Sequence, residues 1–131
     1  MPPAQPDGEL TLQTIAMPAD TNSNGDIFGG WLMAQMDLGS SVLARARAQG
    51  RVATVAVEAM TFLQPVHVGD TVSIYARLLK AGRTSMQIET EVWVTRQPSR
   101  ERLKMTEARF VFVAVDETGA KRALPDEEHD P

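Results

Sequence analysis

One acidic residue interrupts an otherwise uncharged stretch of the chain. From Gly29 to Ala44 the sequence reads GGWLMAQMDLGSSVLA, and Asp37 is its only charged residue. The length and composition predict a helix that ends in an arginine-bearing turn before Gly50. A carboxylate on such a face is costly to bury without partners, and carboxylates of this kind serve as general bases. The pattern allows two roles for Asp37: a catalytic carboxylate, or a structural acid that hydrogen-bonds a loop or reaches solvent.

Two glycines at the predicted helix start form a second group with a chemical use. Gly29 and Gly30 would let a ligand approach the free backbone N–H groups of the first turn, whose dipoles favour developing negative charge on a carbonyl oxygen. Gly30 lies seven residues before Asp37, which is about two helical turns, so the two residues share a face. A tight turn into a crowded helix is the alternative explanation of the glycine pair.

The remaining positions on the face of Asp37 are mostly small, so another chain or a ligand can approach the backbone there. They are Met33, Ala34, Ser40, Ser41 and Ala44. A turn-rich loop, Ala19 to Asp26, leads into this helix. Because the helix has almost no charged face, we expect it to be enclosed on nearly all sides.

Alternation with a period of two predicts strands in the rest of the chain. The first spans Glu9 to Ala16, and the second spans Arg51 to Leu63, with Ala53, Val55, Val57 and Ala59 on one face. The third follows the Gly69-Asp70 turn and carries Val72, Ile74, Ala76 and Leu78. The fourth follows Ala81 to Arg83, with Met86, Ile88, Val92 and Val94 facing inward and Gln87, Glu89, Glu91 and Trp93 opposite. After the polar connection Gln97 to Arg102, the last spans Lys104 to Val115.

This order, β-α-β-β-β-β, predicts an α+β domain in which an antiparallel sheet wraps around one long helix. A single unit of this kind leaves one sheet face and an edge strand open. We therefore expect at least a dimer, with the sheets of two copies joined. The domain covers residues 9–125, and the Pro- and Gly-rich residues 1–8 and the acidic residues 126–131 are expected to be disordered ends.

Composition excludes several classes of function. A net charge of −4 argues against a general nucleic-acid binder, since such affinity comes from a basic surface. The sequence contains no run of about 18 apolar residues, so it predicts no membrane span. The absence of cysteine excludes disulfides, thiolate nucleophiles and cysteine-ligated zinc. With no secretory signal pattern at the N-terminus, we expect a cytoplasmic protein.

Four motifs in order resemble the bacterial YciA-like acyl-CoA thioesterases. They are MPADTNSNGDIFGGWLMAQMD at 17–37, TVAVEAMTF at 54–62, PVHVGD at 65–70 and GRTS at 82–85. The likeness extends from about Leu12 to Pro125. It implies a hotdog fold, double-hotdog dimers assembled as a trimer of dimers, and hydrolysis of acyl-CoA to free acid and CoA in fatty acid metabolism. It implies neither a metal nor a cofactor, since CoA belongs to the substrate.

The resemblance also implies roles for the residues discussed above. Asp37 is the general base or the nucleophile, and Gly30, with Gly29 beside it, polarises the thioester carbonyl. The site lies across the dimer interface, so Asp37 should meet Asn22, Asn24 and Asp26 of the other protomer, which could orient water or the thioester. Asp26 is also a rival catalytic carboxylate, because some other hotdog thioesterases use an acid in this loop, and it equally suits a helix cap.

For CoA, the resemblance points to the turn Gly82-Arg83-Thr84-Ser85 and to the strand residues Val57, Glu58 and Met60. Arg83 can pair with a phosphate, the Thr84 and Ser85 hydroxyls can donate, and strand backbone can bind the pantetheine amides. Lys80 and Arg122 are secondary candidates. Each of these charges is equally explained as a solvated surface group.

Two other functions are alternatives to acyl-CoA hydrolysis. An enoyl-thioester hydratase typically needs a histidine beside an acid, and the only histidines, His67 and His129, fall in a connection and in the tail. Ser40 and Ser41 lack a placed base for the same reason. A non-catalytic acyl-CoA-binding or regulatory module is the remaining alternative, and product formation distinguishes it from an enzyme.

Overall fold

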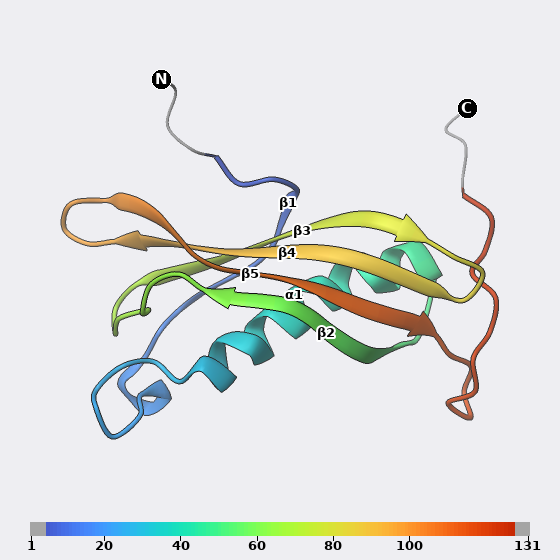
Figure 1. The fold of residues 1–131 in the computed structure, drawn as a ribbon, viewed down its shortest axis with the longest axis horizontal. Helices are drawn as coiled ribbons and strands as arrows, with labels where there is room; N and C mark the ends of the chain where they lie inside the picture. The colour runs from blue at the N-terminus through green and yellow to red at the C-terminus, as the bar shows by residue number, and fades with distance from the viewer. Residues whose placement is uncertain (1–4, 128–131) are drawn as a thin grey trace.

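The computed structural model describes residues 5–127 and contains one long helix and five strands in the predicted order (Figure 1). The strands are β1 (Glu9–Ile15), β2 (Val52–Phe62), β3 (Thr71–Ala81), β4 (Ser85–Arg96) and β5 (Glu101–Ala114). The helix α1 spans Gly29–Ala48, one turn beyond the predicted Ala44, and a short 3-10 helix, η1, spans Pro18–Asp20. The α+β order predicted from the sequence is confirmed.

The five strands form one antiparallel sheet in the order β1-β3-β4-β5-β2, and α1 lies along one face of it (Figure 1). Consecutive strands β3, β4 and β5 are joined by hairpins, whereas β1 and β2, which flank the helix in sequence, lie at opposite edges. β2 therefore pairs with β5 only and leaves its outer edge without a partner among residues 5–127. Such an edge is a template for pairing with another chain.

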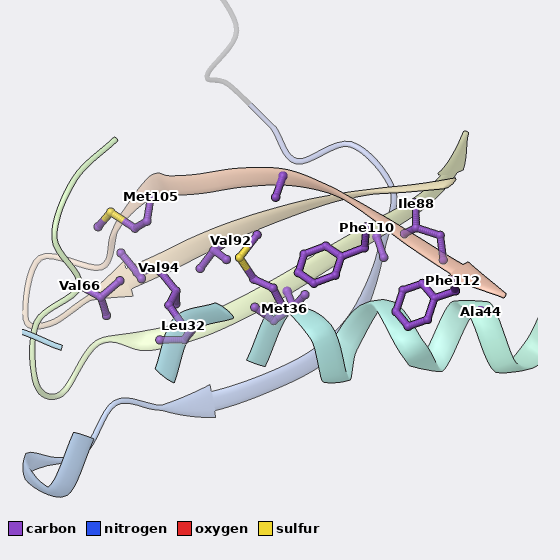
Figure 2. Close-up of a cluster of buried hydrophobic side chains, with 14 of the residues drawn as sticks. Leu32, Met36, Ala44, Val66, Ile88, Val92, Val94, Met105, Phe110 and Phe112 are labelled. Carbon is purple, nitrogen blue, oxygen red and sulfur yellow. The ribbon is translucent and has the colours of Figure 1, made fainter. Parts of the chain in front are cut away.

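The core lies between α1 and the sheet (Figure 2). The four β4 side chains predicted to face inward, Met86, Ile88, Val92 and Val94, are all buried there. Figure 2 shows Phe110 and Phe112 of β5 above the helix beside Met36 and Ala44. Gly39 brings the helix close to β3, because an added Cβ would lie only 2.6 Å from Ile74 Cγ2.

Two of the residues predicted on the opposite face of β4, Glu91 and Trp93, are buried as well. The Trp93 indole N–H donates to Glu91 Oε1 at 2.9 Å, and Lys104 Nζ lies 3.4 Å from the same oxygen. The Asp7 backbone N–H donates to Glu91 Oε2 at 3.2 Å. Asp7, which lies in the end expected to be disordered, thus contacts this face, while residues 1–4 lie outside the described residues.

The prediction that α1 is enclosed on nearly all sides is wrong for the single chain. One side of the helix packs on the sheet, but Leu38 is 56 % exposed, Val42 is 49 % exposed, and Met33 and Ala34 are also exposed. Ser40 and Ala44, predicted to share an approachable face with Asp37, are buried against the sheet, where Ser40 Oγ lies 2.6 Å from Thr90 Oγ1. The exposed apolar helix side is a surface that another chain would cover.

Two bulges interrupt the alternation expected for β2. Its register against β5 shifts between Thr54 and Ala56 and again between Glu58 and Thr61. Val55 and Val57 are consequently exposed, whereas Val52 and Met60 pack against the core. The prediction of one continuous apolar face from Ala53 to Ala59 is therefore wrong, because each bulge changes which side chains face the helix.

The C-terminal segment after β5 is held by backbone and side-chain hydrogen bonds. Leu124 N–H donates to the Arg83 carbonyl at 2.8 Å, and Arg47 Nη1 donates to the Pro125 carbonyl at 2.7 Å. Arg122, a secondary CoA candidate, donates to the carbonyls of Ala48, Arg51 and Val115 and so joins the helix end to the sheet. Of the acidic tail predicted to be disordered, residues 126 and 127 are exposed and 128–131 lie outside the described residues.

Candidate active site

Asp37 lies in the middle of α1 and is half-buried. Its Oδ1 accepts a hydrogen bond from the Thr54 hydroxyl at 2.6 Å. No other side-chain partner of the Asp37 carboxylate occurs within residues 5–127, so Oδ2 keeps its acceptor capacity. This one side-chain partner comes from β2, an element that the sequence pattern did not connect to Asp37.

The position of Thr54 follows from the irregularity of β2. Thr54 stands opposite Phe112, whose side chain faces the helix, and the first β2 bulge begins at the next residue. Bulges re-aim side chains and are frequent beside functional sites. Threonine is common in any strand, so its type and spacing contain no signal for this contact.

The start of α1 leaves several backbone donors free. The first intrahelical hydrogen bond is donated by Leu32 to the Phe28 carbonyl at 3.2 Å, so the N–H groups of Gly29, Gly30 and Trp31 precede it and have no intrahelical acceptor. No acidic residue occupies this first turn. A Cβ added to Gly30 would meet no atom within 4 Å, whereas one added to Gly29 would lie 3.4 Å from the Phe62 ring. The helix start is therefore open to a ligand in the single chain.

The loop before α1 is organised by Asn22. Its Oδ1 accepts from the backbone N–H groups of Asn24 (2.9 Å) and Asp26 (3.1 Å), and its own N–H donates to the Asp26 carbonyl at 2.7 Å. Asn22 thus shapes the loop, while Asn24 and Asp26 are exposed. The N-cap position is Phe28, and no side chain caps the helix there, so the alternative of Asp26 as a helix cap is wrong.

Within one chain these groups do not converge on Asp37. Seven residues separate Gly30 from Asp37, which corresponds to about 10 Å along the helix axis. The loop residues Asn22, Asn24 and Asp26 make no hydrogen bond to Asp37 within residues 5–127. A carbonyl bound at the helix start is thus distant from the carboxylate of its own chain.

A pocket of about 360 Å³ opens beside Gly29, between the helix start and the segment after β2. Its lining includes Ile27, Leu32, Phe62, Leu63 and Val66, with Gln64 and Pro65, and no charged side chain of the described residues lines it. Local sequence patterns contain no signal for this pocket, because it forms between segments that are at least 30 residues apart.

The predicted CoA contacts lie in two separate places. Gly82 to Ser85 form the turn between β3 and β4, where Gly82 N–H donates to the Ser85 carbonyl at 2.8 Å, and Arg83 and Lys80 are exposed. Ser85 stands opposite Val113, which in turn pairs with Ala53 near the start of β2. Val57 and Glu58 lie farther along β2, opposite Phe110 and Arg109, and Met60 lies in the second bulge. One chain therefore does not bring the turn and these strand residues together.

Two further expectations concern absent features. Among the residues that the structure describes, no three His, Asp or Glu side chains are grouped so as to hold a metal ion. Over the same residues, no helix has the length and hydropathy to cross a bilayer.

His67 lies in the connection between β2 and β3, where its backbone N–H donates to Asp70 Oδ2 at 2.9 Å. His129 lies outside the described residues.

Comparison with known proteins places this architecture in a family. The sequence profile of the Thioesterase superfamily matches residues 24–99. The acyl-CoA thioester hydrolase YciA of Salmonella typhimurium is 60 % identical over 123 residues, which cover 92 % of each chain. A hexameric thioesterase from Yersinia pestis superposes with a TM-score of 0.90 at 58 % identity, covering 94 % of this chain and all of that one.

A more distant structure names the fold. The hexameric hotdog fold thioesterase of Campylobacter jejuni superposes with a TM-score of 0.86 at 36 % identity and covers 90 % of this chain and 91 % of that one. The single helix on a five-stranded antiparallel sheet matches these proteins, as the motifs at 17–37, 54–62, 65–70 and 82–85 had indicated. The chain therefore belongs to the YciA-like family of hotdog-fold acyl-CoA thioesterases, within the Thioesterase superfamily.

Proposed function

We propose that this chain is an acyl-CoA thioesterase that hydrolyses acyl-CoA to a free carboxylic acid and CoA, with Asp37 as its catalytic carboxylate. The observation that supports this most directly is the state of Asp37: one oxygen is held by Thr54 and the other is free, on a helix face without another charge. The naming of relatives at 60 % identity as acyl-CoA thioester hydrolases supports the reaction. CoA is part of the substrate, and we assign no cofactor.

The chemistry divides between two ends of the site. The thioester carbonyl oxygen accepts hydrogen bonds from the N–H groups of Gly30 and Gly29, whose helix dipole stabilises the oxyanion. Asp37 Oδ2 either takes a proton from water as it attacks the carbonyl carbon, or attacks that carbon itself to give an anhydride that water then opens. In both routes the C–S bond breaks and the CoA thiolate leaves.

We propose that two chains build each site. The roughly 10 Å of helix between Gly30 and Asp37 is too long for both to act on one carbonyl group. Asp37 of one protomer would instead face Gly30 and Asn24 of its partner, and the exposed Asn24 amide would orient water or the thioester. Asn22 would hold that loop in shape, and Asp26 is the rival carboxylate.

Assembly and CoA binding would also depend on two chains. The open β2 edge and the exposed apolar side of α1 favour a dimer with a continuous sheet, and the hexameric relatives favour a trimer of such dimers. CoA would bind the turn Gly82-Arg83-Thr84-Ser85 and Lys80 through its phosphates, and Val57, Glu58 and Met60 through its pantetheine arm. Because the turn and the β2 residues lie apart within one chain, one chain would supply the turn and its partner would supply the strand residues. A cytoplasmic location and a role in fatty acid metabolism stay predictions from the sequence.

Thiol release from acyl-CoA tests the proposal. Asp37→Asn keeps the size of the side chain and an oxygen for Thr54, and it should lower kcat by at least about 100-fold, the lower range for loss of a general base. Asp26→Asn is the matched control and should retain activity. Normal turnover by Asp37→Asn would remove Asp37 from catalysis, and loss confined to Asp26→Asn would assign the reaction to the loop acid. A wild type that binds CoA but releases no thiol would be a regulatory module instead.

Subunit mixing tests the shared site. Asp37→Asn and Asn24→Ala chains, each inactive alone, are unfolded together and reassembled. If the site spans two chains, mixed dimers contain one intact site and regain part of the thiol release. No recovery in reassembled mixed dimers would show that both residues act within one chain.

A further inference from the structure

We propose that the pocket beside Gly29 holds the hydrocarbon part of the acyl group, and that Leu63 and Phe62 limit its length. This inference rests on the proposed function, because it takes the helix start as the place where the thioester carbonyl binds. The pocket would take linear acyl chains, and Leu63 and Phe62 would select among them by length.

The pocket lies beside the helix start, where the thioester carbonyl is proposed to bind. Gly29 is both a lining residue of the pocket and one of the N–H groups that precede the first helical hydrogen bond. The substituent on a carbonyl carbon bound there begins within a few ångströms of the pocket. A Cβ added to the next residue, Gly30, would meet no atom within 4 Å, which leaves room for the sulfur and the CoA arm.

The chemistry of the lining matches a hydrocarbon. Phe62 and Leu63 are 52 % and 50 % exposed, so their apolar surfaces face the pocket without cover from residues 5–127. The one polar side chain of the lining, Gln64, directs its Nε2 to the Lys104 carbonyl at 3.5 Å. No charged side chain of the described lining is present to receive a phosphate, and a volume of about 360 Å³ falls within the range of roughly 300–1,000 Å³ for small-molecule pockets.

The walls of the pocket are preformed. Ile27 N–H donates to the Val66 carbonyl at 3.3 Å, and Leu63 N–H donates to the Met105 carbonyl at 2.7 Å. Leu32 and Val66 also belong to the hydrophobic core, and Figure 2 shows them at its end beside Val94 and Met105. A bound chain would thus meet a fixed surface, so a change in lining volume should change chain-length selectivity.

The test measures kcat/KM for a series of acyl-CoAs from acetyl to palmitoyl. Leu63→Trp should lower the ratio of long-chain to acetyl kcat/KM by at least 10-fold, because a filled hydrophobic pocket discriminates by chain size, and acetyl-CoA does not reach into it. Phe62→Ala should shift the ratio the other way. Val68→Trp, on the same connection but outside the lining, is the matched control and should leave the ratio within about twofold of wild type.

Failure of the pocket assignment and failure of the thioesterase function would give different results. An unchanged ratio in Leu63→Trp, with acetyl-CoA still hydrolysed, would overturn the pocket assignment alone. A change of native mass in Leu63→Trp without a change of ratio would overturn it in favour of a second copy filling the pocket. Equal shifts in Leu63→Trp and Val68→Trp would also overturn it. A wild type inactive on every acyl-CoA would overturn the proposed function itself.

Discussion

Arg96 binds both carboxylate oxygens of Asp70, with Nε donating to Oδ1 at 3.1 Å and Nη2 to Oδ2 at 2.9 Å. Asp70 is only 2 % exposed and also accepts the His67 backbone N–H, while Arg96 Nη2 donates to the Pro65 carbonyl at 3.2 Å. The hydrogen bond to Asp70 raises the pKa of Arg96, against a smaller opposing effect of burial. This pair therefore fixes the connection between β2 and β3, which forms one wall of the pocket beside Gly29.

Removal of the Asp70 charge should destabilise the fold. Asp70→Asn leaves the Arg96 guanidinium without its counter-charge, and we expect the free energy of unfolding to fall by about 2–3 kcal/mol, below the 3–5 kcal/mol of fully buried pairs because Arg96 is partly exposed. Urea unfolding measures this. Arg77→Gln breaks the exposed Arg77–Glu89 pair and should change stability by less than about 1 kcal/mol. Equal losses in both variants would contradict the structural role of Asp70.

Thr54 should act as a positioning residue for Asp37. Thr54→Val keeps the shape but removes the hydroxyl donor, and loss of a hydrogen bond to a charged group, about 1.5–3 kcal/mol, corresponds to roughly a 10- to 100-fold lower kcat. Thr54→Ser restores the donor and should recover most of the rate. A wild-type kcat in Thr54→Val, or a loss of rate in Thr54→Ser equal to that in Thr54→Val, would exclude this role.

Two buried threonines should respond in opposite directions to the same substitution. Thr106 Oγ1 is buried with no partner among the described residues, so Thr106→Val should raise the free energy of unfolding by about 1–2 kcal/mol. Thr90 Oγ1 lies 2.6 Å from Ser40 Oγ, so Thr90→Val should lower it by a similar amount. Chemical denaturation of the two variants compares them directly. A loss of stability in Thr106→Val would show that its hydroxyl has a partner in the assembled protein.

The exposed side of α1 should be an interface between chains. Val42→Glu places a charge on an apolar surface that includes Leu38, and we expect the oligomer to dissociate, as measured by light scattering. Thiol release should fall together with assembly, since the proposed site needs two chains. Glu117→Lys, an exposed change in the turn after β5, is the control and should leave the native mass unchanged. An active Val42→Glu monomer would contradict the two-chain site.

Local patterns were sufficient for much of the fold. The start of α1 at Gly29 and the inward face of β4 follow from helical composition and from alternation, both of which depend on neighbouring residues. Asp37 was identifiable because a lone charge in an apolar helix is visible in the sequence. Its proposed role and its proposed companions Gly30 and Asn24 came from the motifs, since pattern alone left a structural acid as an equally good interpretation.

Contacts between residues far apart in sequence depend on the tertiary structure. The contact of Thr54 with Asp37 depends on a bulge in β2, and a shift of one residue in a strand moves its side chains to the other face. The Asp70–Arg96 pair and the pocket beside Gly29 likewise join segments whose separation in sequence contains no periodic signal. The lone charge in the helix was thus a property of the sequence, whereas its partner and its free oxygen follow from sheet register, which is set by the packing of the whole domain.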